Sequence, residues 1–360
     1  MRAAARQRSL SSAPVADAPF APPALESKRP VPRPALGYAL VWSAVVLWSL
    51  NAVIAKVVLD SAGLSSLRLA EVRATGSALI LVVAVAILRP ASLRTTRREL
   101  AFLAVFGILG LAFVQLFYFV GIRRLDIGIA LVIQYLAPVF VALWARFYVH
   151  EPVRRRLWLA IALSLLGLSL VVELWGGGSS LDGLGVLACL VTALAYAAYV
   201  LMAESSLERG RDVYSLLAWG FTFAALFWAV VQPWWSFPTE IASESVSLLG
   251  RFEDATAPVW LLLAYIVVLG TVVPFILLVS ALHHVPATRV TIVAMLEPVL
   301  AAIVAWVWLG EELAAVQIAG GPIVLIGVIL AQTSRVDDRA VEHEDPRKMQ
   351  EDVAISRPRA

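Results

Sequence analysis

Glu297 places a carboxylate inside the long apolar stretch VAMLEPVLAAIVAWVWLGE, residues 293–311. An ionisable side chain deep in a membrane-spanning segment is costly, and by default it marks a functional site. Two chemistries suit such a carboxylate: it could take up and release a proton, or it could bind the ammonium group of a solute. The structural alternative is a neutral Glu297 hydrogen-bonded to a neighbouring helix. The sequence alone leaves both interpretations open.

Other charged side chains occur at different depths of the apolar segments. Arg73 lies about seven residues, or roughly 10 Å, inside its segment, where it could bind a carboxylate or satisfy carbonyl groups at a helix junction. Arg68 and Glu71 are three residues apart on the same segment and can pair. Lys56 lies near the end of an earlier segment, so we expect its long side chain to reach the interface.

Polar and aromatic side chains also lie near the middle of three further apolar segments. Singly, each is more often a packing residue than a ligand. Together with Glu297 they are typical of a mostly apolar cavity with a few directed hydrogen bonds. We therefore predict a central binding site that includes Trp48, Asn51, Arg73, Gln134, Tyr135, Tyr196, Tyr199 and Glu297.

Pro138 and Pro298 interrupt two of the segments. Each lacks an N–H group and frees the carbonyl four residues earlier, at Gln134 and Ala294. We predict that these prolines kink or hinge moving helices, with ordinary bends for packing as the alternative.

Several chemistries have no support in the sequence. It contains no H-E-x-x-H motif, no aspartate pair within the apolar segments and no G-x-x-x-x-G-K-[ST] motif. The single cysteine, Cys189, excludes an internal disulfide and a cysteine-based metal cluster. We therefore expect no metal, no cofactor and no enzymatic activity.

The composition indicates an integral membrane protein. Of the 360 residues, 60% are hydrophobic and 15% are charged, whereas soluble chains are about 45–50% apolar and about 25% charged. A membrane helix needs about 20 mostly apolar residues. This length predicts an all-α protein with ten spans: 37–58, 66–88, 100–120, 127–149, 156–174, 183–203, 214–235, 258–281, 287–309 and 315–333. Residues 1–35 and 334–360 read as a disordered N-terminal tail and a charged C-terminal tail.

The distribution of arginine predicts the orientation. If the N-terminus is cytoplasmic, eleven arginines fall at inner loops and adjoining helix ends, and three fall at outer ones, Arg123, Arg124 and Arg251. Ten spans return the C-terminus to the same side. We expect a multi-pass protein of the cytoplasmic membrane with both termini inside.

The second half of the chain repeats the first at an offset of 160 residues. Gly270 falls on Gly110, Pro298 on Pro138 and Glu311 on Glu151. Matches of Gly, Pro and Glu in one register indicate an internal duplication, residues 36–175 and 182–333. Five spans is an odd number, so the two repeats must insert in opposite orientations. Inverted repeats are typical of secondary transporters, whose binding site lies near the midplane between the repeats.

These motifs resemble the EamA-type transporters of the drug/metabolite transporter superfamily over residues 37–333. The resemblance rests on LWSLNAVIAKVVLD, LRLAEVRATGSAL and LAPVFVALWARFYVHE, and on LEPVLAAIVAWVWLGEEL and IAGGPIVLIGVIL in the second half. One departure is Ser49, where the family usually has Gly after the Trp. The resemblance implies transport of small metabolites such as amino acids, sugars, bases or drugs, coupled to protons or uncoupled.

We therefore predict a secondary transporter, an exporter working by alternating access, with a small-molecule substrate and the lipid bilayer as partners. No nucleic acid is expected, and the sequence fits a monomer or a homodimer. The alternative is a flippase for lipid or polyprenyl-linked substrates. An intramembrane enzyme or a receptor fits less well, because catalytic motifs and a sizeable soluble domain are both lacking.

Overall fold

The computed structural model describes residues 32–125, 127–150, 153–174 and 182–333. All of them belong to one compact unit, Val31–Ala360. The predicted C-terminal tail, and the predicted N-terminal tail up to residue 31, lie outside the described residues.

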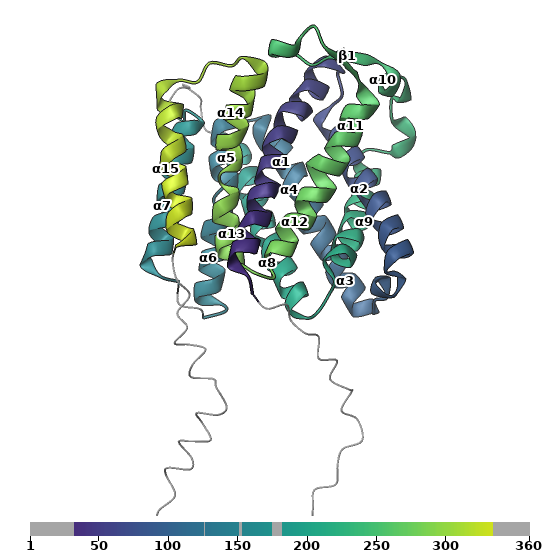
Figure 1. The fold of residues 1–360 in the computed structure, drawn as a ribbon. Helices are drawn as coiled ribbons and strands as arrows, with labels where there is room; N and C mark the ends of the chain where they lie inside the picture. The colour runs from purple at the N-terminus through teal and green to yellow at the C-terminus, as the bar shows by residue number, and fades with distance from the viewer. Residues whose placement is uncertain (1–31, 126, 151–152, 175–181, 334–360) are drawn as a thin grey trace, which may run out of the picture. The chain divides into compact units, whose positions relative to one another are not determined.

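The described chain is built almost entirely from helices that run roughly side by side (Figure 1). The first half contains α1 Pro34–Ser61, α2 Ser66–Leu88, η1 Pro90–Leu93, α3 Arg97–Val105, α4 Phe113–Ile122, α5 Ile127–Gln134, α6 Ala137–Phe147 and α7 Arg155–Val171. The second half contains α8 Gly183–Glu208, α9 Val213–Val231, α11 Val259–Val267, α12 Val273–Ala281, α13 Ala287–Ala294, α14 Glu297–Leu309 and α15 Ala315–Gln332.

Polar caps set the starts of several helices. The side chain of Ser65 accepts a hydrogen bond from the Arg68 N–H at the start of α2, and Asp182 and Asp212 do the same at α8 and α9. Thr96 and Glu99 form a reciprocal capping box at α3. The caps lie in the polar breaks between the apolar runs. Each of these helices therefore begins just before its apolar run.

Nine helices among the described residues are long and apolar enough to cross a membrane. The protein is therefore a multi-pass membrane protein. The remaining predicted span, 156–174, corresponds to α7, which has only 17 residues. A count of ten spans accordingly stays a prediction.

Two of the spans are interrupted by π-helical turns. Phe106–Ala112 joins α3 to α4, and Val268–Val272 joins α11 to α12. Two other spans are broken in the middle: residues 135–136 separate α5 from α6, and residues 295–296 separate α13 from α14. The two breaks are 160 residues apart, so the offset seen in the sequence recurs in the backbone.

Two pairs of corresponding helices, α7 with α15 and α2 with α9, pack antiparallel. At one end, Nη2 of Arg156, in the first turn of α7, donates to Oγ1 of Thr333, just after α15, at 2.8 Å. At the other end, Nε2 of Gln317 in α15 donates to the carbonyl of Val171, the last residue of α7, at 3.1 Å. The end of α2 meets the start of α9 in the same way.

Glycines bring α7 and α15 into direct backbone contact. A Cβ added at Gly167 would lie 2.8 Å from the carbonyl oxygen of Gly320, and one added at Gly320 would lie 2.6 Å from that of Gly167. Small residues at this contact thus let the two helices approach closely.

The segment between α9 and α11 folds over one end of the bundle. It contains α10 Thr239–Ser243 and a two-stranded antiparallel hairpin, β1 Ser245–Ser247 paired with β2 Thr256–Pro258. The hairpin could not be predicted from the sequence, because three-residue strands leave no alternating pattern. Nε1 of Trp308 in α14 donates to the carbonyl of Leu248 at 3.0 Å and fastens the loop to the bundle.

Candidate functional site

The breaks in the two halves meet in the interior. Glu297 is the first residue of α14 and the eleventh of the 23-residue candidate span Ala287–Leu309, which places it about 15 Å from the span's start. Tyr135 lies in the break between α5 and α6. Its buried hydroxyl donates to Oε2 of Glu297 at 3.1 Å. Glu297 is the one ionisable residue at the centre of the α13–α14 span. It is therefore hydrogen-bonded to a residue from the other half of the chain.

Ser49 ties the first helix to the same break. Its hydroxyl lies 2.8 Å from the carbonyl of Val45 and 3.0 Å from the carbonyl of Glu297. The side chain is buried. The residue that departs from the family pattern thus still allows α1 to approach closely. Sequence reasoning gave Ser49 no role at the site, and its position next to Trp48 was the available signal.

Arg73 from α2 faces Glu297 from another direction. Its Nε donates to Oγ1 of Thr271 at 3.0 Å, and that hydroxyl donates to the carbonyl of Ile266 at 2.8 Å inside the π-helical turn. Arg73 lies within electrostatic range of Glu297, and no salt bridge joins the two within the described residues. Of the two predicted roles, contact with a helix junction is seen, and the terminal guanidinium nitrogens have no hydrogen bond to the described chain.

Two further tyrosines lie near the carboxylate. Tyr118 of α4 and Tyr196 of α8 lie within electrostatic range of Glu297. Tyr196 stacks on Tyr199, with ring centroids 6.1 Å apart. Tyr199 is fully buried, and its hydroxyl has no partner among the described residues. Tyr118 was not predicted, because nothing in the mostly apolar stretch around it distinguishes it from a packing residue.

Trp48 and Asn51 of α1 lie against the α11–α12 span. The ring of Trp48 packs edge-on against Phe275 at 5.4 Å. The side chain of Asn51 lies so close to Gly270 that a Cβ there would collide with it. Oδ1 of Asn51 is buried and finds no hydrogen-bond partner in the described chain. Asn51 therefore packs at the second π-helical turn, with a free acceptor.

Gln134 ends α5, and its side chain is partly exposed. It adjoins Tyr135 in the chain, and no hydrogen bond of its side chain is seen in the described part of the structure. The structure thus brings Tyr135, Tyr196, Arg73 and Glu297 together and leaves Gln134 without a contact to that group.

The two prolines differ from the prediction in one respect. They do not kink continuous helices, since α5 and α13 end before them and Pro138 and Pro298 are the second residues of α6 and α14. A proline in the first turn costs nothing, because that N–H has no helical partner. Whether the breaks act as hinges stays a prediction.

The remaining charged residues singled out in the sequence lie away from this group. Arg68 and Glu71 form a buried pair at 3.2 Å, as predicted. Lys56 pairs with Glu311 at 2.5 Å, with both side chains about half exposed, at 50% and 48%. Neither pair contacts Glu297.

The arrangement combines acidic, basic and hydroxyl groups. A carboxylate, a guanidinium with free terminal nitrogens and several hydroxyls converge in an otherwise apolar interior. Within the described ranges no group of three or more His, Cys, Asp or Glu side chains could hold a metal ion. These groups can form ion pairs and hydrogen bonds, and the Glu297 carboxyl group can bind and release a proton.

This chain matches one known protein family and is similar to several known transporters. The profile of the EamA-like transporter family matches residues 35–173 and again residues 183–333. The "Uncharacterized transporter YdfC" of Bacillus subtilis (strain 168) is 25% identical over 64% of this chain and 71% of the relative. The threonine/homoserine exporter RhtA of Salmonella typhimurium (strain SL1344) is 25% identical over 66% of this chain and 72% of the relative.

A solved crystal structure has the same fold. It superposes with a TM-score of 0.66, covering 82% of this chain and 96% of that chain, at 16% identity. At this identity the likeness concerns the fold alone.

Proposed function

Since this chain belongs to the EamA-like transporter family, we propose that it exports small metabolites, amino acids among them, across the cytoplasmic membrane by alternating access. It is a transporter and not an enzyme. The observation that carries the proposal is the Glu297 carboxylate, bound by Tyr135 where the broken helices of the two halves meet.

The proposed mechanism uses two five-helix repeats inserted in opposite orientations. The antiparallel packing of α7 with α15 supports this arrangement. So does the 2.7 Å ion pair between Arg89, just after α2, and Asp212, just before α9. Two such repeats can pack in two equivalent ways, one open to each side of the membrane, with the site between them.

The proposed substrate class is zwitterionic. Glu297 would bind the ammonium group of an amino acid, and the free terminal nitrogens of Arg73 would bind its carboxylate. A small apolar side chain would then face the surrounding aromatic rings. RhtA, with which this chain shares 25% identity, is a threonine/homoserine exporter, which is consistent with this class.

Glu297 would also couple export to protons. A carboxyl group that binds a solute ammonium in one state can bind a proton in the other, so that the two ligands compete for the same oxygens. The Tyr135 hydroxyl would keep the side chain in place during the exchange, since it can donate to either form.

The proposed orientation places both termini in the cytoplasm. Arg94, Arg98 and Arg209 lie at the same end of the bundle as Arg211, around the loops that follow α2 and α8. Clusters of arginine in short loops favour the cytoplasmic side.

The test is transport by the purified protein in liposomes. We expect efflux of radiolabelled threonine or homoserine, with competition among neutral amino acids. A labelled phospholipid should not exchange between leaflets faster than in empty vesicles, because a carboxylate at the centre of the site disfavours a phosphate. Lipid exchange without amino acid efflux would replace the proposal by the flippase alternative.

A further inference from the structure

A second polar pocket lies at one end of the bundle, far along the chain from the Glu297 site. It is formed where the α2–α3 connection meets the α8–α9 connection, and its volume is about 680 Å³. Six charged side chains line it: Arg94, Arg98, Glu99, Arg209, Arg211 and Asp212. Nothing in the transport mechanism proposed above uses this pocket.

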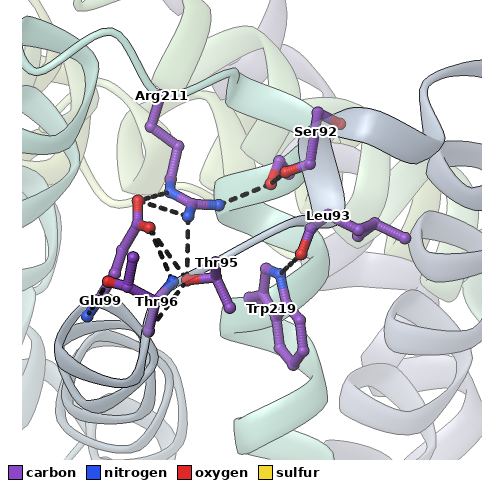
Figure 2. A network of polar contacts seen from close by, with 8 residues as sticks. Ser92, Leu93, Thr95, Thr96, Glu99, Arg211 and Trp219 are labelled. Atoms are coloured by element: carbon purple, nitrogen blue, oxygen red, sulfur yellow. Dashed lines mark hydrogen bonds and ion pairs between the residues drawn. The ribbon is translucent and has the colours of Figure 1, made fainter. Parts of the chain in front are cut away.

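Arg211, one of the lining residues, is at the centre of a hydrogen-bond network (Figure 2). Its guanidinium donates to Oε1 of Glu99 at 2.8 Å, to Oγ of Ser215 at 2.7 Å and to Oγ1 of Thr95 at 3.3 Å. The side chain of Arg211 is only 7% exposed. The hydroxyl of Ser215 in turn donates to the carbonyl of Ser92 at 2.5 Å. The walls are therefore fixed before any ligand enters.

Trp219 makes a further hydrogen bond beside this network. Its Nε1 donates to the carbonyl of Leu93 at 3.3 Å, from α9 to the last residue of η1 (Figure 2). Two connections that are distant in sequence are thus joined into one rigid rim.

Both carboxylates of the lining are already neutralised by partners. Glu99 pairs with Arg211, and Asp212 pairs with Arg89 at 2.7 Å while capping α9. Three arginines remain around the opening, namely Arg94, Arg98 and Arg209.

These three arginines are exposed. No salt bridge to a carboxylate is seen for any of them in the part of the chain that the structure describes. Arg209 stacks over the ring of Phe102 at 5.6 Å, which orients its guanidinium. The rim therefore presents positive charge to solvent.

The start of α3 reinforces this charge. Thr96 caps the helix, and Arg98 lies in its first turn. Backbone N–H groups at a helix N-terminus favour anions and are a common element of phosphate sites. Here the capping box already occupies the N–H groups of Thr96 and Glu99, which leaves those of Arg97 and Arg98 to act together with the arginine side chains.

The surroundings of the pocket are apolar on the lipid side. Ile87 and Leu88 at the end of α2 are 72% and 77% exposed, and Phe102 contributes to the lining. A phosphate held in the pocket would therefore lie beside surface suited to acyl chains. Basic pockets at the cytoplasmic ends of membrane helices are suited to anionic lipid headgroups.

We propose that this pocket binds a phosphate group, presented either by an anionic phospholipid of the inner leaflet or by a phosphate-bearing solute. Arg94, Arg98 and Arg209 would contact the phosphate oxygens, and the Arg211 network would hold the rim in shape. The site is distinct from the proposed transport site. A bound phosphate would lie against the connection between α8 and α9, which joins two membrane spans.

The experiment compares two double variants with the native chain. Arg94→Gln/Arg98→Gln removes two charges from the rim. Arg146→Gln/Arg155→Gln removes two exposed arginines from the predicted cytoplasmic side, outside the pocket lining. Elution on size exclusion and amino acid efflux check that all three proteins are folded.

Two probes distinguish the source of the phosphate. The first is retention of phosphatidylglycerol on protein released from nanodiscs of phosphatidylcholine with phosphatidylglycerol, measured by native mass spectrometry. The second is thermal stabilisation of detergent-solubilised protein by inorganic phosphate. We expect the pocket variant to bind at least about tenfold more weakly, since each arginine near an anionic surface contributes about a factor of five.

A loss confined to phosphatidylglycerol identifies a lipid site, and a loss confined to inorganic phosphate identifies a solute site. If the pocket variant binds both probes as the native chain does, or if the control variant loses as much, the proposal is wrong.

Discussion

Replacing Glu297 by glutamine is the most informative single change in this protein. Gln has nearly the same shape, and its amide oxygen can still accept the hydrogen bond that Tyr135 donates at 3.1 Å. The start of α14 should therefore keep its structure. What is lost is the negative charge opposite Arg73 and the ability to carry a proton.

The expected loss follows from the value of a charged hydrogen bond. A bond to an ionised group contributes about 1.5–3 kcal/mol, and every 1.4 kcal/mol is about a factor of ten in affinity. If the carboxylate binds the ammonium group of the solute, the KM for an amino acid should rise by roughly 10-fold to 150-fold. Folding should change little, because the hydrogen bond and the shape are conserved.

The assay is amino acid efflux from liposomes with and without an imposed pH gradient. For the native chain, acid on the side that receives the solute should stimulate export. For Glu297→Gln, this stimulation should disappear. Tyr135→Phe is the matched control: it removes the hydroxyl that donates to the same carboxylate but leaves the charge, so stimulation by the gradient should remain.

An unchanged KM together with an unchanged response to the pH gradient would refute this reasoning. Glu297 would then be a structural clamp between the two halves. In that case Glu297→Ala, which removes the acceptor of the Tyr135 hydrogen bond, should lower thermal stability, whereas Glu297→Gln should leave both stability and transport unchanged.

Three further outcomes are expected. Gly270→Ala should lower the midpoint of thermal unfolding, because the new Cβ collides with Asn51 and overpacking costs about 1–3 kcal/mol. Arg68→Met should destabilise by about 3–5 kcal/mol, since it leaves a buried carboxylate unpaired, whereas Lys56→Met breaks a half-exposed pair and should cost at most about 1 kcal/mol. Thermal stability should fall as pH drops below the usual histidine value of about 6.5, and His283→Gln should flatten that dependence.

The sign of the pH effect follows from the surroundings of His283, in the connection between α12 and α13. Burial first, and then the neighbouring His284, lower the pKa of His283, while Asp212 opposes them. Neutral His283 is therefore favoured in the folded state. Its contribution to stability is complete above its ordinary pKa and is lost as pH falls toward the lowered one.

Each of these outcomes has a control or a contradiction. Gly183→Ala should be silent, because nothing lies within 4 Å of a Cβ there. Equal losses for Arg68→Met and Lys56→Met would contradict the difference in burial. A pH profile of unfolding that is the same with and without His283 would show that other groups titrate.

A few residue types carry the 160-residue offset, and the same offset recurs in the backbone. Gly110 and Gly270, at the same offset, both fall in π-helical turns. Pro138 and Pro298 both start the second halves of broken helices. Glycine allows close approach and unusual backbone conformations, and proline fixes φ and removes an N–H, so their register stands out in a chain where Ala, Leu and Val match by chance.

The form of the interruptions could not be predicted. A proline inside an apolar run predicts a kink as readily as a break, and a π-helical turn has no pattern of its own. Thr271 illustrates the second case: its hydroxyl donates to the carbonyl of Ile266, five residues earlier, and Arg73 then donates to it. That combination depends on packing between α2 and the α11–α12 span.

The contacts between the site residues also could not be predicted from the sequence. In α2, Leu79 and Ile87 are exposed whereas Leu81 and Val85 are buried, although all four are equally apolar. Lipid-facing and core-facing positions therefore look alike, and hydropathy does not tell which helices meet. The polar residues Tyr135 and Glu297 were both singled out, but their contact required the fold.

The topology of the two repeats tests the central claim most directly. In a Cys189→Ser background, one cysteine is introduced either at Arg94, before α3, or at Asp254, before α11; both positions are exposed. These helices correspond in the two halves. A membrane-impermeant maleimide added to intact cells should label position 254, and it should label position 94 only after permeabilisation. Labelling of both positions from the same side would contradict the opposed repeats, and with them the transport mechanism built on Glu297.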